Sequence, residues 1–308
     1  MEFKIQLTDI QSVLELANIT GFSGDYTALG GGEVNNTYKL NFPNKHLILR
    51  VAKDAGQSTL QNEARALKLL DSPYIPKLIY FSENHLIHDR MFILESYLPG
   101  TIQARLTNDP FYNLGELLAM VHQVTSDEPG INLKEQFLYA CKAFGDEAYL
   151  YNHPDKALQQ LIRSAFGEFE KLKPIYAAVA PTLIHSDATP SNILVDGNNI
   201  GLIDWEFSKY NDPMCDFSTI YYEDMEFNRG KWRAQIREEE KQALFDGYRS
   251  AGGKIDEDRI KFWIRFDKLG AAVFLYWRLN QSTRSTQENE TVQYKIDYDN
   301  LVASLLTT

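Results

Sequence analysis

The chain has 308 residues, of which 44% are hydrophobic, and it carries a formal net charge of −11. This length and composition suffice for one large domain or two lobes with a sizeable core, and no apolar run approaches the length of a membrane span. The acidic balance without a basic cluster argues against a nucleic-acid or anionic-membrane partner. Two widely separated cysteines, Cys141 and Cys215, favour a reducing, cytoplasmic setting over a disulfide framework.

The first third of the sequence predicts a short capped helix over residues 8–17, followed by an antiparallel sheet. Five strands are expected, over residues 26–29, 36–42, 46–51, 77–82 and 91–97. A glycine-rich turn with Gly31, Gly32 and Asn35 separates the first two strands. Glycines let a backbone approach phosphate groups and present N–H donors to them. A loose hairpin has the same composition, so both interpretations stay open here.

The third strand contains a charge, Arg50, inside an otherwise apolar run. A charge in a buried strand needs a partner. The candidate is Glu63, in a helix expected over residues 59–70 with apolar side chains at helical spacing. Such a pair holds nucleotide phosphates in protein kinases, whereas a purely structural ion pair is the alternative. Lys53 is the rival cation, but from its place in the strand it should point to the opposite face.

The rest of the chain is predicted to be mainly helical. Helices are expected over residues 111–124, 133–151, 155–172, 214–226, 238–251, 256–281 and 294–306. His122 is expected to be a core or interlobe histidine rather than a ligand. The fold class is therefore α+β, with a small five-stranded antiparallel lobe over residues 1–98 and a larger helical lobe over residues 99–308. The boundary follows the last strand, where Pro99 and Gly100 stop it.

Polar residues gather in one stretch of the helical half, between residues 183 and 216. His185, Asp187 and Asn192 precede a short apolar strand, and Asp204 follows a second one. The turn at 196–199 has hairpin chemistry, which should bring Asn192 and Asp204 to the same end of a hairpin. The spacing matches that of phosphoryl-transfer enzymes of the kinase type.

The residue types suit that chemistry. A carboxylate must orient the attacking hydroxyl and accept its proton, which is the role expected of Asp187. Magnesium takes oxygen ligands, which the Asn192 amide and the Asp204 carboxylate would supply. His185, the second candidate catalytic residue, is expected to brace the loop rather than react, and Glu206 is a possible assistant.

This stretch resembles the choline and ethanolamine kinases, within the aminoglycoside-phosphotransferase-like, protein-kinase-like superfamily. The resemblance rests on the run 203–207 (Ile-Asp-Trp-Glu-Phe), on Asn-Asp-Pro at 211–213 and on Asp216, and it extends from about residue 29 to about 298. It implies a two-lobed kinase-like fold, ATP and Mg²⁺. It also implies a hinge near Glu95 and Tyr97 whose backbone pairs with adenine, and an Asp216 that accepts N–H bonds from the catalytic loop. A solvated strand end at Glu95 and a plain helix cap at Asp216 stay open as alternatives.

The resemblance further implies a substrate pocket for a cationic alcohol. Phe274, Trp277 and Gln281 are similar to a Trp-x-x-Trp-x-x-x-Gln segment that supplies rings to choline. Glu223 falls where the family places a carboxylate beside the ammonium group, and the neighbouring Tyr222 would add a further ring. A plain aromatic core stays open as the alternative. The expected activity is an ATP-dependent choline kinase. The alternatives are kinases of ethanolamine, thiamine or an aminoglycoside, and a nucleotide-binding pseudokinase without turnover.

Overall fold

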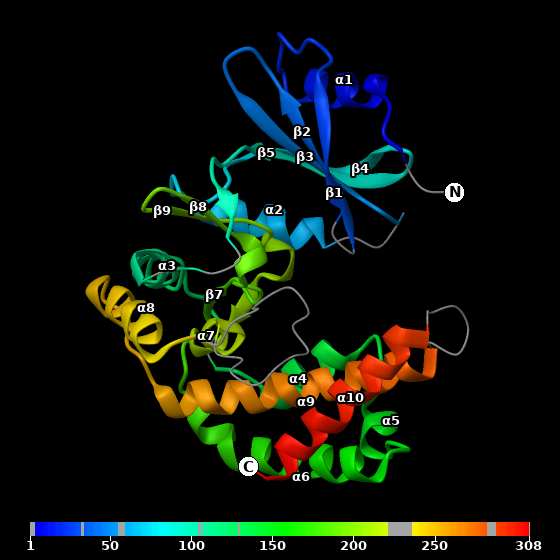
Figure 1. Cartoon of the computed structure of the whole chain (residues 1–308), viewed down its shortest axis with the longest axis vertical. Coiled ribbons are helices and arrows are strands. Elements are labelled where there is room, and N and C mark those ends of the chain that lie inside the picture. Colours follow the sequence, from blue (N-terminus) through cyan, green and yellow to red (C-terminus); the bar gives the residue numbers. More distant parts are fainter. Residues whose placement is uncertain are drawn as a thin grey trace.

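The computed structural model describes residues 4–31, 34–54, 59–103, 106, 108–128, 130–220, 236–281 and 288–307. A twisted antiparallel sheet occupies one end of the molecule and a larger group of helices the other (Figure 1). The predicted α+β class, with a five-stranded sheet before a mostly helical remainder, is confirmed. None of the helices in these residues is long and apolar enough to cross a membrane.

The sheet has the strand order β1-β2-β3-β5-β4, with every neighbouring pair antiparallel. Its strands are β1 (Tyr26–Gly31), β2 (Asn35–Asn41), β3 (His46–Ala52), β4 (Leu78–Ile87) and β5 (Arg90–Ser96). Helix α1 (Leu7–Leu16) begins one residue earlier than expected. Its N-cap is Gln6 rather than Thr8, and the Gln6 backbone N–H donates to Asp9 Oδ2 at 2.8 Å.

Side chains of β3 alternate between the two faces of the sheet. Leu47, Leu49 and Val51 belong to an apolar cluster with the buried residues of α1. Ala52 instead packs in the large cluster that contains α2 (Leu60–Leu69) and the helical part. Arg50 shares this second face because two residues along a strand restore the same direction. The predicted strand charge therefore faces α2 and the helical part.

The helical part differs from the prediction in its boundaries. Its helices are α3 (Asn108–Val121), α4 (Leu133–Cys141), α5 (Glu147–Tyr151), α6 (Lys156–Tyr176), α7 (Met214–Ile220), α8 (Glu238–Ser250), α9 (Glu257–Gln281) and α10 (Glu288–Leu306). The single helix expected over 133–151 is divided, because Asp146 caps a new helix by accepting a hydrogen bond from Tyr149 N at 2.8 Å. For the helix expected over 214–226, residues beyond 220 lie outside the described part.

Helices α3 and α8 cross at two glycines, Gly115 and Gly247. A Cβ atom added at Gly115 would lie 2.6 Å from Tyr248 N, and one added at Gly247 would lie 2.7 Å from the Tyr112 carbonyl carbon. The two backbones can approach this closely only without side chains at these positions. The crossing holds α8 against α3. His122 follows directly after Val121, the last residue of α3.

Short strands and turns position the polar stretch identified in the sequence. They are β6 (Thr101–Ile102), β7 (Thr182–Ile184), η1 (Pro190–Asn192), β8 (Ile193–Asp196), β9 (Asn199–Leu202), η2 (Trp205–Phe207) and β10 (Lys209–Asn211). β8 and β9 form the predicted hairpin, with Gly197 at φ +60° in its turn. β7 pairs with β10, which brings the two ends of the stretch side by side.

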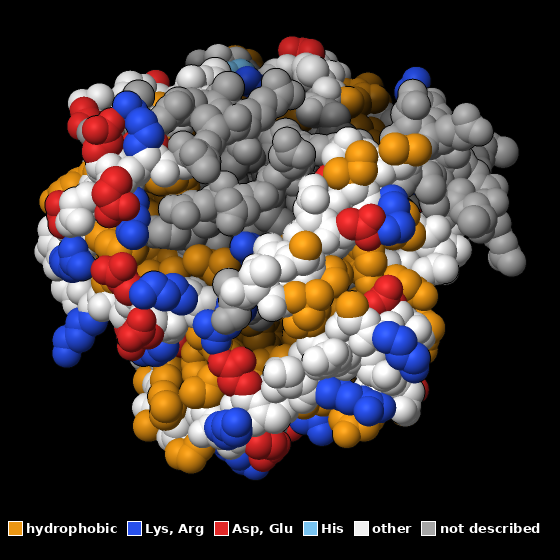
Figure 2. Space-filling view, turned by 60° about the horizontal axis from the view of Figure 1, so that its bottom comes forward, with side chains coloured by type: hydrophobic (Ala, Val, Ile, Leu, Met, Phe, Trp, Pro, Cys, Tyr) orange, Lys and Arg blue, Asp and Glu red, His pale blue; other side chains and the backbone are white. Residues whose placement is uncertain are grey.

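The lower face of the molecule, turned forward in Figure 2, shows Lys and Arg side chains interspersed with Asp and Glu. Hydrophobic side chains lie between them. On this face the basic residues do not gather into one field, which is in keeping with the net charge of −11.

Candidate active site

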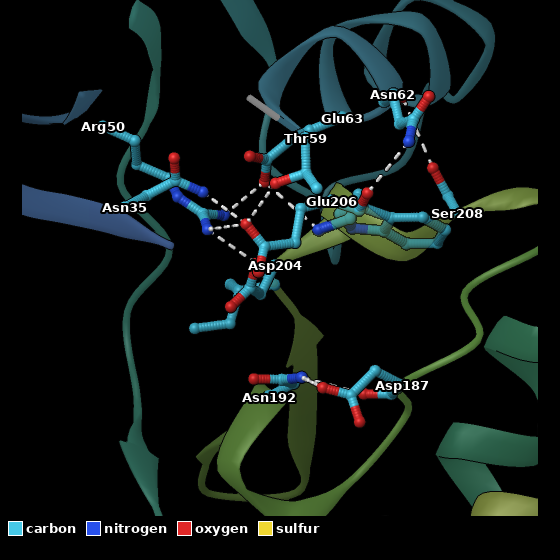
Figure 3. A network of polar contacts seen from close by, with 12 residues as sticks. Asn35, Arg50, Thr59, Asn62, Glu63, Asp187, Asn192, Asp204, Glu206 and Ser208 are labelled. Atoms are coloured by element: carbon cyan, nitrogen blue, oxygen red, sulfur yellow. Dashed lines mark hydrogen bonds and ion pairs between the residues drawn. The ribbon is translucent and has the colours of Figure 1, made fainter. Parts of the chain in front are cut away.

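Three predicted residues, Asp187, Asn192 and Asp204, are brought together by β7, η1 and the β8–β9 hairpin (Figure 3). The Asn192 amide Nδ2 donates to the Asp187 backbone oxygen at 2.8 Å and to its carboxylate Oδ2 at 2.9 Å. The Ile203 N–H donates to the Asn192 backbone oxygen at 3.0 Å, which holds the residue before Asp204 against the loop that carries Asn192. The site therefore combines a carboxylate and an amide from one loop with a carboxylate from the end of the hairpin.

His185 lies in the interior beneath this loop and has no exposed surface. Its Nε2 lies 3.0 Å from the Ile203 carbonyl oxygen, and its Nδ1 accepts the Asp187 N–H at 3.2 Å. These contacts assign the proton to Nε2, and the ring packs edge-on against Trp205 with centroids 4.5 Å apart. In this position His185 braces the loop between Asp187 and the hairpin.

Asp216 fixes the backbone of the same loop from α7. Its carboxylate accepts N–H bonds from His185 at 2.8 Å and Ser186 at 2.7 Å, as expected for this residue. Ser186 has φ +67°, a conformation that costs a serine about 1 kcal/mol or more and needs such support. Burial alone would raise the pKa of Asp216, but hydrogen bonds from His122 and His185 lower it below its usual value.

His122 was expected to be a core residue, and the structure gives that position a specific contact. Its Nε2 lies 3.1 Å from Asp216 Oδ2, and its Nδ1 lies 2.9 Å from the Tyr248 hydroxyl. The histidine therefore links α8 to Asp216, which holds the backbone at His185 and Ser186. Sequence spacing carries no signal for this link, because the three residues come from separate helices.

Arg50 forms the predicted ion pair with Glu63, with Nη1 2.6 Å from Oε1. Its second nitrogen, Nη2, also lies 2.6 Å from Asp204 Oδ1 and 3.4 Å from Glu206 Oε2. The guanidinium thus joins the sheet, α2 and the end of the hairpin. Burial raises the pKa of Glu63 to about 7, while Arg50 opposes the shift. Figure 3 shows the cluster above the Asp187–Asn192 pair.

Glu206 contacts both Arg50 and Asn35, the residue that begins β2. It accepts a hydrogen bond from the Asn35 amide and another from Thr59 Oγ1 at 2.8 Å. Asn35, from the glycine-rich segment that the sequence offered as a phosphate-binding turn, is only 3% exposed and is turned towards this carboxylate. Burial and then the neighbouring Asp204 raise the pKa of Glu206. The sequence pattern did not predict the hydrogen bond from Thr59 to Glu206.

A cavity of about 490 Å³ adjoins this cluster between the sheet and the β8–β9 hairpin. Arg50 and Asp204 line it, as do Glu95 and Tyr97 of the predicted hinge. The Lys39 ammonium lies 4.2 Å from the centroid of the Tyr97 ring. Of the two predicted loop glycines, Gly31 ends β1, whereas Gly32 lies outside the described residues.

The predicted aromatic pair on α9 has a third member. Phe274 and Trp277 are stacked with centroids 6.3 Å apart, and Phe144 packs 5.4 Å from the first ring and 5.3 Å from the second. All three rings are half-buried. The sequence analysis did not identify Phe144, because it predicted one continuous helix over residues 133–151. Phe144 lies in the break between α4 and α5. Tyr222 and Glu223, the other predicted substrate residues, lie outside the described residues.

Oxygen donors at this site fit a hard cation. The Asn192 Nδ2 is held by Asp187, which directs the amide oxygen away from that bond, and the Asp204 side chain is 31% exposed. Among the described residues no group of three or more His, Cys, Asp or Glu side chains is arranged to hold a metal ion. Two protein oxygens are nevertheless typical for Mg²⁺, which takes its remaining ligands from phosphates and water.

A sequence model described as the phosphotransferase enzyme family (APH) matches residues 25–263. The chain belongs to this family. The matched region of this phosphotransferase contains every residue of the site described above except the α9 rings, Phe274 and Trp277. A search of curated proteins finds no significant match.

Solved structures with the same fold include choline or ethanolamine kinase family proteins and antibiotic phosphotransferases. A choline/ethanolamine kinase family protein from Mesorhizobium loti has 17% identity and a TM-score of 0.64, covering 98% of this chain and 94% of that chain. Choline kinase LicA from Streptococcus pneumoniae has 19% identity and a TM-score of 0.65, with 97% of each chain covered. Spectinomycin phosphotransferase APH(9)-Ia, in complex with ADP and spectinomycin, has 15% identity and a TM-score of 0.66, covering 99% of this chain and 98% of that chain. At these identities the likeness establishes a shared phosphotransferase fold.

Proposed function

We propose that this phosphotransferase moves the γ-phosphoryl group of ATP to the hydroxyl of a small cationic alcohol, with choline as the substrate. One observation carries the transfer chemistry: the loop with the hydrogen-bonded pair Asp187 and Asn192 is bound to the end of the hairpin at Ile203, and the next residue, Asp204, lines a cavity together with Arg50. The nucleotide is supported by solved relatives whose complexes contain ADP or ATP. The cavity volume of about 490 Å³ lies in the range of small-molecule sites.

In this proposal Asp187 orients the attacking hydroxyl and accepts its proton. The hydrogen bond from Asn192 at 2.9 Å holds the carboxylate in one orientation, and the braced His185 holds the loop. Asn192 and Asp204 would hold Mg²⁺, which when bound neutralises charge on the phosphates. Arg50, positioned by Glu63, would bind the remaining phosphate oxygens in place of its present contact with Asp204.

Choline is proposed because of the aromatic cluster. A trimethylammonium group has no N–H donor, so rings hold it better than hydrogen-bond acceptors do. Phe144, Phe274 and Trp277 provide three half-buried rings in mutual contact. Ethanolamine and aminoglycosides carry N–H donors and would favour carboxylates instead.

The proposal is tested by ADP release with choline, ethanolamine, thiamine and an aminoglycoside as acceptors. We expect choline to give the highest kcat/KM. Trp277→Leu should raise the KM for choline by about 2- to 30-fold and leave the KM for ATP unchanged, because a cation–π contact contributes about 0.5–2 kcal/mol. Tyr139→Leu, which removes an exposed ring of α4, is the control.

Phosphorylation of an aminoglycoside but not of choline would refute the substrate proposal and retain the phosphotransfer chemistry. Nucleotide binding without ADP release for any acceptor would favour the pseudokinase. An unchanged KM for choline in Trp277→Leu would indicate that the three rings belong to the hydrophobic core and do not bind the substrate.

A further inference from the structure

The Asn-Asp-Pro motif at residues 211–213 takes no part in the site described above. Its middle residue, Asp212, lies between β10 and α7 and has no exposed surface. Burying a carboxylate is costly unless the charge is paired and hydrogen-bonded. The contacts of Asp212 therefore show which parts of the chain this buried charge connects.

The Asp212 carboxylate connects two helices. Its Oδ1 accepts the N–H of Met214, the first residue of α7, at 2.9 Å. From the first turn of α9, Arg259 donates to both oxygens, through Nη2 to Oδ1 and through Nε to Oδ2 at 2.8 Å. Trp263 Nε1, one turn further along α9, also donates to Oδ2 at 2.9 Å. The hydrogen-bonded carboxylate thus fixes the start of α7 against the start of α9.

Helix α7 extends this connection to the catalytic loop. The Cys215 N–H donates to the Asp212 backbone oxygen at 2.9 Å, so Asp212 begins the turn that leads into α7. Asp216 lies in the first turn of this helix. Its carboxylate accepts the backbone N–H groups of His185 and Ser186, at 2.8 Å and 2.7 Å. A shift of the start of α7 would therefore move the carboxylate that holds the catalytic loop.

Helix α9 extends the connection in the other direction, to the rings proposed to bind the cationic group. Phe274 and Trp277 lie on this helix, roughly four turns beyond Arg259. Helix α7 packs against α9 (Figure 1), and Ser218 Oγ donates to Asp267 Oδ2 across their contact. Because a packed helix moves as a unit, the contact with Arg259 sets where the rings lie relative to the catalytic loop.

Resting on the proposed transfer to a cationic alcohol, we propose that Asp212 is a positioning residue for the reaction. It fixes Asp216 and α9 relative to each other, and so places the bound alcohol within reach of Asp187. Asp212 is not among the residues that line the cavity beside Arg50, so its replacement should leave nucleotide binding intact. A misplacement of about 1 Å by a change far from the chemistry can slow a reaction by about 100-fold.

The kinetic test combines steady-state ADP release, with the best acceptor of wild type, and calorimetric titration of ADP. Asp212→Asn should lower kcat by about 10- to 100-fold and leave the Kd for ADP unchanged. Arg259→Gln should do the same, and the double variant should lose no more than the worse of the two, because both changes break one connection. Asp212→Asn is nearly isosteric, and the Arg259 side chain is 25% exposed, so water can solvate the released charge. Every rate is measured below the onset of thermal unfolding of the variant concerned.

A second measurement needs no turnover. The N–H groups of His185 and Ser186 are held by Asp216, and their hydrogen exchange, read by mass spectrometry on peptides, reports on how firmly they are held. Asp212→Asn should speed exchange over residues 183–187 by about 10-fold, because the helix that carries Asp216 is loosened. Exchange over β5, residues 90–96, should keep its wild-type rate.

Arg265→Gln is the matched control. Arg265 also lies on α9 and forms an ion pair, with its Nη2 2.7 Å from Oε1 of Glu168 on α6. That pair fastens α9 to α6 rather than to α7. The kcat of this variant, its Kd for ADP and its exchange over residues 183–187 should equal those of wild type.

Wild-type exchange over residues 183–187 in Asp212→Asn would overturn this inference, whatever the activity. So would a wild-type kcat in both single variants, or an equal loss of kcat in Arg265→Gln. If wild type releases ADP with no acceptor, the proposed function fails, and the exchange measurement alone decides whether Asp212 positions the loop.

Discussion

Replacing Arg50 by methionine should destabilise the protein strongly. The guanidinium is 6% exposed and lies 2.6 Å from both Glu63 and Asp204. Methionine has a similar length but no charge, so Arg50→Met leaves the fully buried Glu63 carboxylate uncompensated. Removing one partner of a buried ion pair typically costs about 3–5 kcal/mol. Because the unfolding entropy is about 2.1 cal/mol/K per residue, the same loss would lower the unfolding temperature of the 308-residue chain by roughly 5–8 °C.

The loss should depend on pH. In the folded wild type the pKa of Glu63 is raised to about 7 from an ordinary value of 4.5. Because the pKa of Glu63 is higher in the folded than in the unfolded protein, this group stabilises the fold fully at pH values below its unfolded pKa of 4.5. This stabilisation is lost as the pH rises through the folded pKa of about 7. The difference between wild type and Arg50→Met should therefore be largest near pH 8 and smaller near pH 5, where Glu63 is protonated in both proteins.

Urea unfolding at pH 5 and pH 8 measures this difference, and a double-mutant cycle with Glu63→Gln isolates its origin. Glu63→Gln is nearly isosteric and neutral, so Arg50→Met/Glu63→Gln should be more stable at pH 8 than Arg50→Met alone. If Arg50→Met unfolds within about 1 kcal/mol of wild type at pH 8, the buried-charge argument is refuted. A deficit that does not change with pH, or that Glu63→Gln does not relieve, refutes it as well.

Three further substitutions have defined outcomes. Gly247→Ala forces a Cβ to within 2.7 Å of the Tyr112 carbonyl carbon, and it should lower the free energy of unfolding, measured by thermal unfolding, by about 1–3 kcal/mol. The control Gly167→Ala places its Cβ in open space on α6 and should raise the free energy of unfolding by up to about 1 kcal/mol. Asp216→Asn should be less stable than wild type at pH 7. Because the pKa of Asp216 is lowered in the folded protein, its contribution to stability is present at pH values above the ordinary pKa of 3.8 and is lost as the pH falls through the folded pKa. Denaturant unfolding of wild type and Asp216→Asn across that pH range should show their stability difference shrinking. A stability difference that does not change with pH would contradict the assignment. Asp187→Asn should reduce kcat by about 10²- to 10⁴-fold with ADP binding retained, and full activity in steady-state assays would exclude this carboxylate as the base.

Local patterns explain why the centre of the site could be predicted from the sequence. Asn192 and Asp204 flank two short apolar strands joined by a turn of hairpin chemistry, so a neighbouring position for the two follows from the turn alone. The partner of Arg50 followed from the cost of burying a lone charge in a strand next to a helix with one suitable carboxylate. Helix boundaries were less certain, because capping by Gln6 and Asp146 depends on local hydrogen bonds that several nearby polar residues could make.

Contacts between distant parts of the chain were decided by the tertiary structure. Arg50 also binds Asp204, Asn35 binds Glu206, and Phe144 joins the rings of α9. Each contact depends on how the sheet, the hairpin and the helices are placed relative to one another. Periodicity and turn chemistry describe only neighbours along the chain, so they determine which chemical groups each segment presents. The packing of buried surfaces determines which of those groups meet across the cavity.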